Sequence, residues 1–188
     1  YKRQIVYICM RGACRQRIWV RMRLLLGIAF AATALLSGAA TADPLPQPQG
    51  PVILTVSGEI STTNSPNGAE FDLAMLDALG TEEFETTTIW TEGLQQFRGV
   101  SLHRLIETLQ AEGAVIAASA LNDYMVEIPL TDAVEGGPIL AFEQNGEALS
   151  VRDKGPLWVV YPYDATASYQ TEVIYARSIW QVKRMEIR

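Results

Sequence analysis

The sequence offers almost no sulfur or imidazole chemistry. Its 188 residues include two cysteines and one histidine, and both cysteines, Cys9 and Cys14, lie close to the N-terminus. From residue 43 onward there is no thiol that could form a disulfide, bind a soft metal or act as a nucleophile. A Ser-His-Asp triad would have to use His103, which we expect on the polar side of a helix. No carboxylate pair has a recognised metal-binding spacing. These absences argue against nucleophilic and zinc-dependent catalysis.

Positive charge is scarce over the same segment. Residues 1–42 hold 7 of the 15 Lys and Arg and none of the 21 acidic residues, so residues 43–188 carry 8 minus 21, a net charge of −13. Nucleic acids and anionic lipids both bind to clustered positive charge. The composition therefore predicts no nucleic-acid partner, and we interpret the acidic surface mainly as a source of solubility.

The longest apolar run has the form of a secretory signal. Residues 24–36 are apolar, two arginines stand just before them, and the small residues Ala40-Thr41-Ala42 follow. A charged region, a short apolar core and a small-residue cleavage site are the three parts of a signal peptide. A membrane anchor is the alternative, but about a dozen apolar residues are few beside the roughly 20 of a spanning helix. We expect residues 1–42 to be an extension and signal peptide, with translation starting at Met22, cleavage before Asp43 and a periplasmic product.

The rest of the chain is expected to form one domain behind a short lead-in. In residues 43–51, proline or glycine occupies most alternate positions, which predicts a flexible segment of polyproline type. Residues 52–188 are numerous enough to bury a single core without disulfides. We therefore expect a single domain over residues 52–188.

Hydrophobic periodicity predicts an α+β domain with few helices. Helices are expected over residues 71–79 and 99–110, closed by Gly80 and Gly113, because apolar residues recur there every three or four positions. Strands are expected in the short apolar or β-branched runs between turn signals, which are residues 52–56, 85–90, 115–121, 124–128, 139–142, 157–161 and 173–182. Strands thus predominate after the main helix, as in the α+β class.

Three polar-aromatic clusters are candidate binding segments. They cover residues 86–91, 120–124 and 152–164. Each places hydrogen-bonding groups beside a large ring at the end of an expected strand. This combination suits a flat polar heterocycle, because a ring can stack on it while carboxylate and amide groups meet its polar edge. The alternative is that Trp90, Tyr124 and Trp158 are core or rim residues and that Asn122-Asp123 is a turn.

The order of several short blocks resembles a known cofactor-binding family. The blocks are Trp90, Gly99-Val100-Ser101-Leu102, Asn122-Asp123-Tyr124 with Pro129, Lys154-Gly155-Pro156-Leu157 with Tyr161-Pro162, and Trp180-Gln181-Val182-Lys183. Together they are similar to the sulfite-oxidase-type molybdopterin-binding domain, and most of all to its small exported branch. The resemblance implies an α+β fold with a mixed β-sheet core and few helices, and a pterin held between loops.

The same resemblance implies a cysteine that this chain lacks. Catalytic members ligate molybdenum with a thiolate upstream of the segment that matches residues 97–102, where this chain reads Phe84-Glu85-Thr86-Thr87-Thr88-Ile89-Trp90. Hydroxyl and indole groups are poor substitutes for a soft thiolate. The enzymes also anchor the cofactor phosphate with an arginine-rich set, which the few basic residues here make hard to build. The sequence therefore favours a protein without catalytic or metal-binding residues, with a pterin as ligand and molybdopterin as the alternative.

The leading hypothesis is an exported pterin-binding protein. The resemblance implies that it senses a pterin and modulates a membrane signalling partner, such as a diguanylate cyclase, a phosphodiesterase or a sensor kinase. The expected ligand-binding residues are Thr88, Trp90, Asn122, Asp123, Tyr124, Asp153, Lys154 and Trp158. Trp90 is expected to stack on the ring, and Asp123 or Asp153 to accept hydrogen bonds from its amidine edge. The alternatives are a molybdenum-cofactor oxidoreductase or its accessory subunit, and a ligand-independent interaction protein.

Overall fold

The computed structural model describes residues 45–188, so the expected extension, signal peptide and cleavage point lie outside the described residues. The strands are β1 Leu54–Gly58, β2 Ala69–Phe71, β3 Thr81–Thr87, β4 Leu94–Ser101, β5 Val115–Ala120, β6 Met125–Pro129, β7 Ile139–Gln144, β8 Glu147–Ala148, β9 Trp158–Val160 and β10 Val182–Ile187. The helices are α2 Leu73–Ala78, α3 Leu102–Leu109 and α4 Glu172–Arg177, with short 3-10 turns η1 Leu130–Asp132, η2 Tyr163–Ala165 and η3 Ala167–Tyr169. Within residues 45–188, no helix combines the length and the apolar character needed to cross a membrane.

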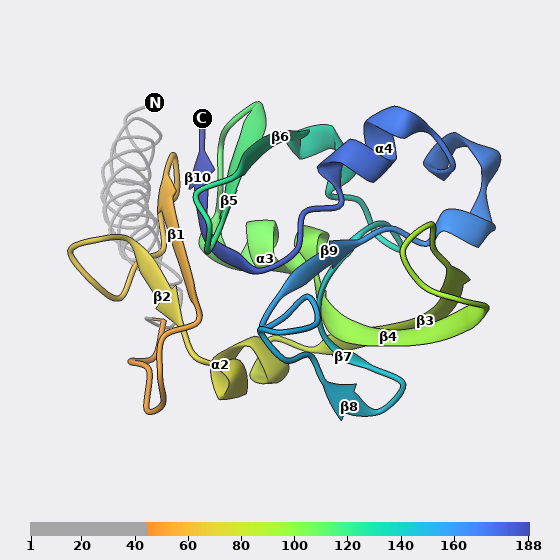
Figure 1. The fold of residues 1–188 in the computed structure, drawn as a ribbon. Helices are drawn as coiled ribbons and strands as arrows, with labels where there is room; N and C mark the ends of the chain where they lie inside the picture. Colours follow the sequence, from red (N-terminus) through yellow and green to blue (C-terminus); the bar gives the residue numbers. More distant parts are fainter. Residues whose placement is uncertain (1–44) are drawn as a thin grey trace, which may run out of the picture. The chain divides into compact units, whose positions relative to one another are not determined.

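The strands form two five-stranded sheets (Figure 1). In the first sheet the order is β2-β1-β10-β5-β6, and the β1–β10 pair is parallel while the other pairs are antiparallel. In the second, β3-β4-β7-β8 follow one another and β9 also pairs with β7, all antiparallel. This mixed, sheet-dominated arrangement with few helices confirms the expected fold class.

One apolar core joins the two sheets. In β1 the side chains alternate, so Leu54 and Val56 are fully buried while their neighbours are half-buried. Helix α3 buries the stripe of leucines that its periodicity predicts. The three largest fully buried side chains, Trp158, Tyr161 and Tyr163, all lie in β9 or directly after it. The core is therefore mostly aliphatic, and its buried Trp and Tyr side chains are concentrated near the end of β9.

The main helix is shorter than the periodicity predicts. Strand β4 extends through Gly99 to Ser101, and α3 begins only at Leu102. Gly99 lies against the backbone of β7, where an added Cβ would collide with the carbonyl oxygen of Leu140, so this position belongs to closely paired strands. The helix ends at Leu109, and Gln110, the next residue, takes the left-handed conformation with φ 48° before the expected glycine is reached.

The expected strand over residues 173–182 is wrong, because the segment begins with helix α4. The hydroxyl of Thr171 accepts a hydrogen bond from the backbone N–H of Ile174, which caps the helix N-terminus. Glu172 in the first turn and Arg177 in the last turn complement the helix dipole. The cap and the end charges outweigh the β-propensity of a short apolar run, and strand pairing resumes only in β10.

Residues 45–51 of the lead-in form neither helix nor strand, and the domain anchors them. One carboxylate oxygen of Asp72 accepts from the backbone N–H groups of Gln49 and Gly50, both at 2.7 Å. The other oxygen accepts from the N–H of Met75 at 2.8 Å and so caps α2. Leu45 is buried in the core. The same aspartate therefore fixes both the start of a helix and the approach of the chain to β1.

Candidate functional site

A cavity of about 350 Å³ lies where three segments meet. Its lining consists of Trp90 from the turn after β3, of Ala120, Asn122 and Tyr124 from the β5–β6 connection, and of residues 175–180 apart from Arg177. Figure 1 shows α4, which leads into the third segment, beside the end of β6. No lining residue carries a charged side chain. The cavity therefore offers aromatic surface and neutral hydrogen-bonding groups.

Trp90 is held in place by a short network of hydroxyl and carboxylate hydrogen bonds. Its backbone N–H donates to the hydroxyl of Thr88 at 3.1 Å, and that hydroxyl lies 2.7 Å from the hydroxyl of Thr91. Just before the turn, Asp164 accepts from the backbone N–H of Thr87 at 2.5 Å and from its hydroxyl at 2.8 Å. These hydrogen bonds keep the pKa of Asp164 below its ordinary value. Strand β3 is thus tied to η2 at the point where the chain turns towards the cavity.

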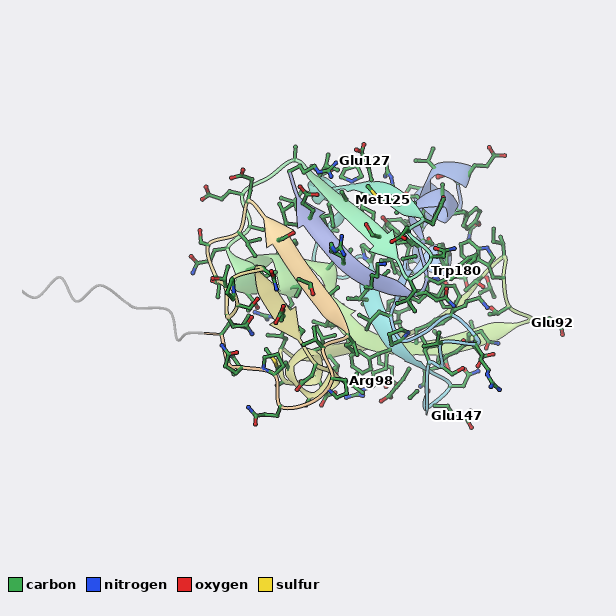
Figure 2. All side chains as sticks on the ribbon, turned by 60° about the vertical axis from the view of Figure 1, so that its left-hand side comes forward. Glu92, Arg98, Met125, Glu127, Glu147 and Trp180 are labelled. Carbon is green, nitrogen blue, oxygen red and sulfur yellow. The ribbon has the colours of Figure 1, made fainter. Side chains whose placement is uncertain are left out.

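Trp90 is also the centre of an aromatic group. Its ring meets those of Trp158, Tyr175 and Trp180 edge to face, with centroids 5.8 Å apart in each case, and that of Tyr163 at 6.2 Å. Such edge-to-face pairs add to the stabilisation that comes from burial. Trp90 is half-buried, and Trp180, labelled in Figure 2, is 39% exposed. Two indole rings therefore contribute both to the domain's packing and to the cavity wall.

Gln181 fixes the backbone beside Trp180. Its φ of 56° lies in the left-handed region, which costs a residue other than glycine roughly 1–2 kcal/mol. Three hydrogen bonds offset that cost: its N–H donates to the carbonyl of Lys154 at 3.0 Å, its carbonyl accepts from the N–H of Leu121 at 2.9 Å, and its side-chain amide donates to the carbonyl of Val151 at 2.7 Å. The cavity wall at Trp180 is thereby joined to both neighbouring loops.

The β5–β6 connection is a turn, as the alternative interpretation of Asn122-Asp123 predicts. The side-chain oxygen of Asn122 accepts from the N–H of Tyr124 at 3.2 Å, and Asp123 takes a φ of 63°. Asp123 points to Lys183, 2.8 Å away, and this hydrogen bond and charge lower the pKa of Asp123. Asn122 and Tyr124 nevertheless line the cavity, so the turn is also part of the site.

Three of the eight expected ligand-binding residues line the cavity: Trp90, Asn122 and Tyr124. Thr88 instead supports the turn that carries Trp90, and Asp123 is engaged with Lys183.

The other three expected residues lie behind or beside the cavity. Trp158 is fully buried and touches Trp90 edge to face. The Nζ of Lys154 lies 5.2 Å from the centroid of the Trp158 ring, in a cation–π arrangement. Asp153 accepts from the hydroxyl of Ser150 at 2.6 Å, within its own loop. The third cluster therefore contributes support for the cavity wall.

Sequence reasoning missed the third cavity segment. Tyr175, Ser178 and Trp180 line the cavity, yet the segment was expected to be a strand without ligand-binding residues. The segment has two large rings with Arg177 and Ser178 between them, and polar groups beside large rings were also the signal in the other clusters. The cap at Thr171 is what distinguishes a helix here, and it turns these residues towards Trp90.

Charged side chains near the cavity are engaged with one another. Arg177 donates to Asp132 at 2.9 Å, as Lys183 does to Asp123 at 2.8 Å. Among residues 45–188, no three His, Cys, Asp or Glu side chains are grouped so that they could hold a metal ion. The residues that line the cavity are therefore uncharged, and the described residues contain no group of side chains suited to a metal ion.

Known proteins share this fold. A family model described as "Oxidoreductase molybdopterin binding domain" matches residues 76–170, which include Trp90 and the β5–β6 turn but not the third cavity segment. No curated protein matches the chain. The crystal structure of the sulfane dehydrogenase SoxCD from Paracoccus pantotrophus is similar, with a TM-score of 0.54 and 18% sequence identity. The match covers 71% of this chain and 37% of that chain, and at this identity it supports the fold alone. Since the family model matches half of the sequence, the chain belongs to the oxidoreductase molybdopterin-binding domain family.

Proposed function

We propose that the cavity binds a flat, uncharged ring of the pterin type, and that the chain serves as a pterin-binding accessory domain of a molybdenum-cofactor oxidoreductase. The observation that carries this proposal is an aromatic, uncharged cavity of about 350 Å³ in a domain of the molybdopterin-binding family. Small-molecule sites typically have about 300–1,000 Å³, apolar and aromatic walls and a few polar groups. A bicyclic ring with a short side chain suits the lower end of that range, with the side-chain amide of Asn122 as a neutral partner for its edge.

The described residues fit the ring of molybdopterin but not its other parts. The cofactor phosphate needs arginine or lysine, and none lines the cavity. Arg177 and Lys183 lie on neighbouring segments, but each is engaged with an aspartate. The resemblance to the family implies a thiolate ligand for the metal, and residues 45–188 contain no cysteine. We therefore assign no metal chemistry to the described residues.

An accessory role is consistent both with the comparisons and with the composition of the cavity. Family membership and the fold likeness to a sulfane dehydrogenase support a place in molybdenum-cofactor oxidoreductase chemistry. The neutral cavity and the lack of a thiol in the described domain support a part other than the catalytic centre. The ring would then be held for transfer, storage or detection.

A second candidate function is an exported pterin sensor of the small branch that lacks the catalytic cysteine. The signal-peptide pattern of residues 1–42 favours it, because an exported domain with a neutral cavity could capture free pterin in the periplasm. This function requires two further properties, export and contact with a membrane signalling receptor. The comparisons support the oxidoreductase proposal more directly than this one.

The first experiment is to purify the full chain from its native cells under gentle conditions. Bound small molecules are extracted and identified by mass and fluorescence, molybdenum is measured, and proteins that remain attached are identified. A pterin without molybdenum, together with a molybdenum enzyme, is the result expected for the accessory domain. A pterin with a membrane receptor supports the sensor instead. Stoichiometric molybdenum would contradict the conclusion that the described residues offer no suitable metal ligand. A protein that contains no ligand and does not bind added pterins would support a ligand-independent interaction protein.

A further inference from the structure

The oxidisable rings of the described residues form one connected group. Residues 45–188 contain eight Trp and Tyr side chains. Seven of them are joined by ring contacts with centroid distances of 5.5–6.3 Å, namely Trp90, Trp158, Trp180, Tyr161, Tyr163, Tyr169 and Tyr175. We call these seven side chains the aromatic relay. The eighth ring, Tyr124, lines the cavity.

The aromatic relay runs from the cavity through the interior to a second, partly exposed ring. Trp180, 39% exposed, lies 5.8 Å from Trp90, which lies 6.2 Å from Tyr163. Tyr163 is 6.3 Å from Tyr161, which is 5.6 Å from the half-buried Tyr169. Tyr161 and Tyr163 are fully buried. The path therefore has a shielded interior and two ends that reach the surface.

Tyr161 has a built-in acceptor for its proton. Its hydroxyl donates to a carboxylate oxygen of Asp132 at 2.7 Å, and the same oxygen accepts from Arg177 at 2.9 Å. Burial and the neighbouring carboxylate raise the pKa of the Tyr161 phenol, so the phenol stays protonated at rest. An oxidised phenol is a strong acid and gives its proton to a hydrogen-bonded base. The Asp132 side chain is 16% exposed, so this base stays in contact with solvent.

We propose that the aromatic relay conducts single electrons between the cavity and Tyr169, with Tyr161 and Asp132 as its proton-coupled site. A one-electron oxidant at the cavity, such as an oxygen-derived radical, takes an electron from Trp90. An electron from Tyr161 then passes through Tyr163 and reduces the oxidised indole of Trp90. At the same time the Tyr161 phenol gives its proton to Asp132. A one-electron donor of the ascorbate type then reduces Tyr161 by way of Tyr169, and Asp132 returns the proton. The net result is the transfer of one electron from the donor to the oxidant, and the protein returns to its starting redox and protonation state.

This inference goes beyond the proposed function and does not depend on the ligand. Aromatic rings can pack in a core without a buried tyrosine that is hydrogen-bonded to a carboxylate. They can also pack without forming a continuous path between two parts of the surface. Elsewhere the described core is filled mainly by aliphatic side chains. The connection of seven of the eight described Trp and Tyr rings into one group is the feature that the relay accounts for.

The test is flash photolysis of the full chain with tris(bipyridine)ruthenium and hexaammineruthenium(III) as reversible quencher. The unmodified protein is expected to show a short-lived tryptophanyl signal that decays into a tyrosyl signal. In Tyr161→Phe most of the tyrosyl signal is lost and the tryptophanyl signal lives longer. Asp132→Asn keeps the phenol and a hydrogen-bond acceptor but cannot take the proton, so tyrosyl formation slows and its solvent-deuterium effect changes.

Two controls separate conduction from structural damage. Thr108→Ala removes a hydroxyl of α3 that takes no part in the ring contacts, and it is expected to behave like the parent. Circular dichroism and the urea midpoint establish that each variant is folded at the temperature of the flash experiment. A Tyr161→Phe protein that is folded and still gives the parental tyrosyl signal would overturn the relay. The same conclusion would follow if Asp132→Asn left the rate of tyrosyl formation unchanged.

Discussion

At the scale of single residues, Trp180 is the most direct probe of the cavity. It lines the cavity and is 39% exposed, so truncation removes wall surface without emptying the core. If a pterin stacks on this ring, Trp180→Ala weakens binding by about 1–3 kcal/mol, by analogy with bases stacked on aromatic side chains. Isothermal titration with free biopterin measures the change.

The matched control for that titration is Leu94→Ala. Leu94 is 57% exposed and does not line the cavity, so its removal is expected to leave the affinity for biopterin unchanged. Equal affinities of the Trp180→Ala variant and the parent would exclude this indole from the site. Trp90→Ala is less suitable, because that ring also supports four neighbouring rings.

A second residue-scale prediction concerns Gly99. An alanine there would place its Cβ against the carbonyl oxygen of Leu140, in the middle of the β4–β7 pair. Overpacking of this kind typically costs about 1–3 kcal/mol. Gly99→Ala is expected to lower the urea midpoint by a corresponding amount. Gly50→Ala is the control, because the nearest atom to its added Cβ lies 3.4 Å away in a side chain, and equal losses in both variants would contradict the argument.

At the scale of elements, α4 controls one wall of the cavity. Thr171 caps its N-terminus, and the loss of such a cap costs about 0.5–2 kcal/mol of helix stability. We expect Thr171→Ala to raise amide hydrogen exchange over residues 172–178 and to weaken pterin binding by loosening Tyr175. Thr108→Ala removes a hydroxyl that donates to the carbonyl of Arg104 within α3 and serves as control. Unchanged exchange in α4 would show that the cap is dispensable.

The elements also show where sequence reasoning succeeds. The turn at Asn145-Gly146 was visible as a turn signal, and both residues take positive φ values of 53° and 77°. Gly80, expected to close the first helix, has a φ of 97°. Local backbone demands of this kind depend on residue type alone, so they can be predicted from sequence.

The rest depends on contacts between segments that are distant in sequence. Gly99 was assigned to a helix because its packing partner in β7 lies about 40 residues further on. Trp90, Asn122 and Tyr124 were identified as candidates, but their convergence with residues 175–180 follows from the fold. Likewise, Asp123 was expected to face a ligand, whereas it bonds to Lys183, 60 positions away. Charge partners of this kind decide which polar residues remain free for binding.

At the scale of the whole molecule, acid is expected to destabilise the domain. Hydrogen bonds or nearby cations lower the pKa values of Asp72, Asp123 and Asp164 in the folded state. The unfolded chain therefore binds more protons as the pH falls, and stability decreases from the ordinary aspartate pKa of about 3.9 downward. Above that pH the contribution is complete.

Urea midpoints measured between pH 7 and pH 3 test this prediction. Asp164→Asn removes one of the carboxylates with a lowered pKa, so the stability of this variant is expected to vary less with pH than that of the parent. Glu147→Gln, at an exposed position of β8, is the control and is expected to follow the parental curve. A parental midpoint that stays constant down to pH 3 would contradict the assigned role of these carboxylates.

The parallel pairing of β1 with β10 has a consequence for the timing of folding. Strand β10 lies between β1 and β5, so these two strands have no common neighbour until residues 182–187 have been made. Contacts between segments so far apart in sequence are slow to form. The first sheet can therefore close only after the ribosome has synthesised almost the whole domain, and a nascent chain that stops before Val182 should remain sensitive to protease.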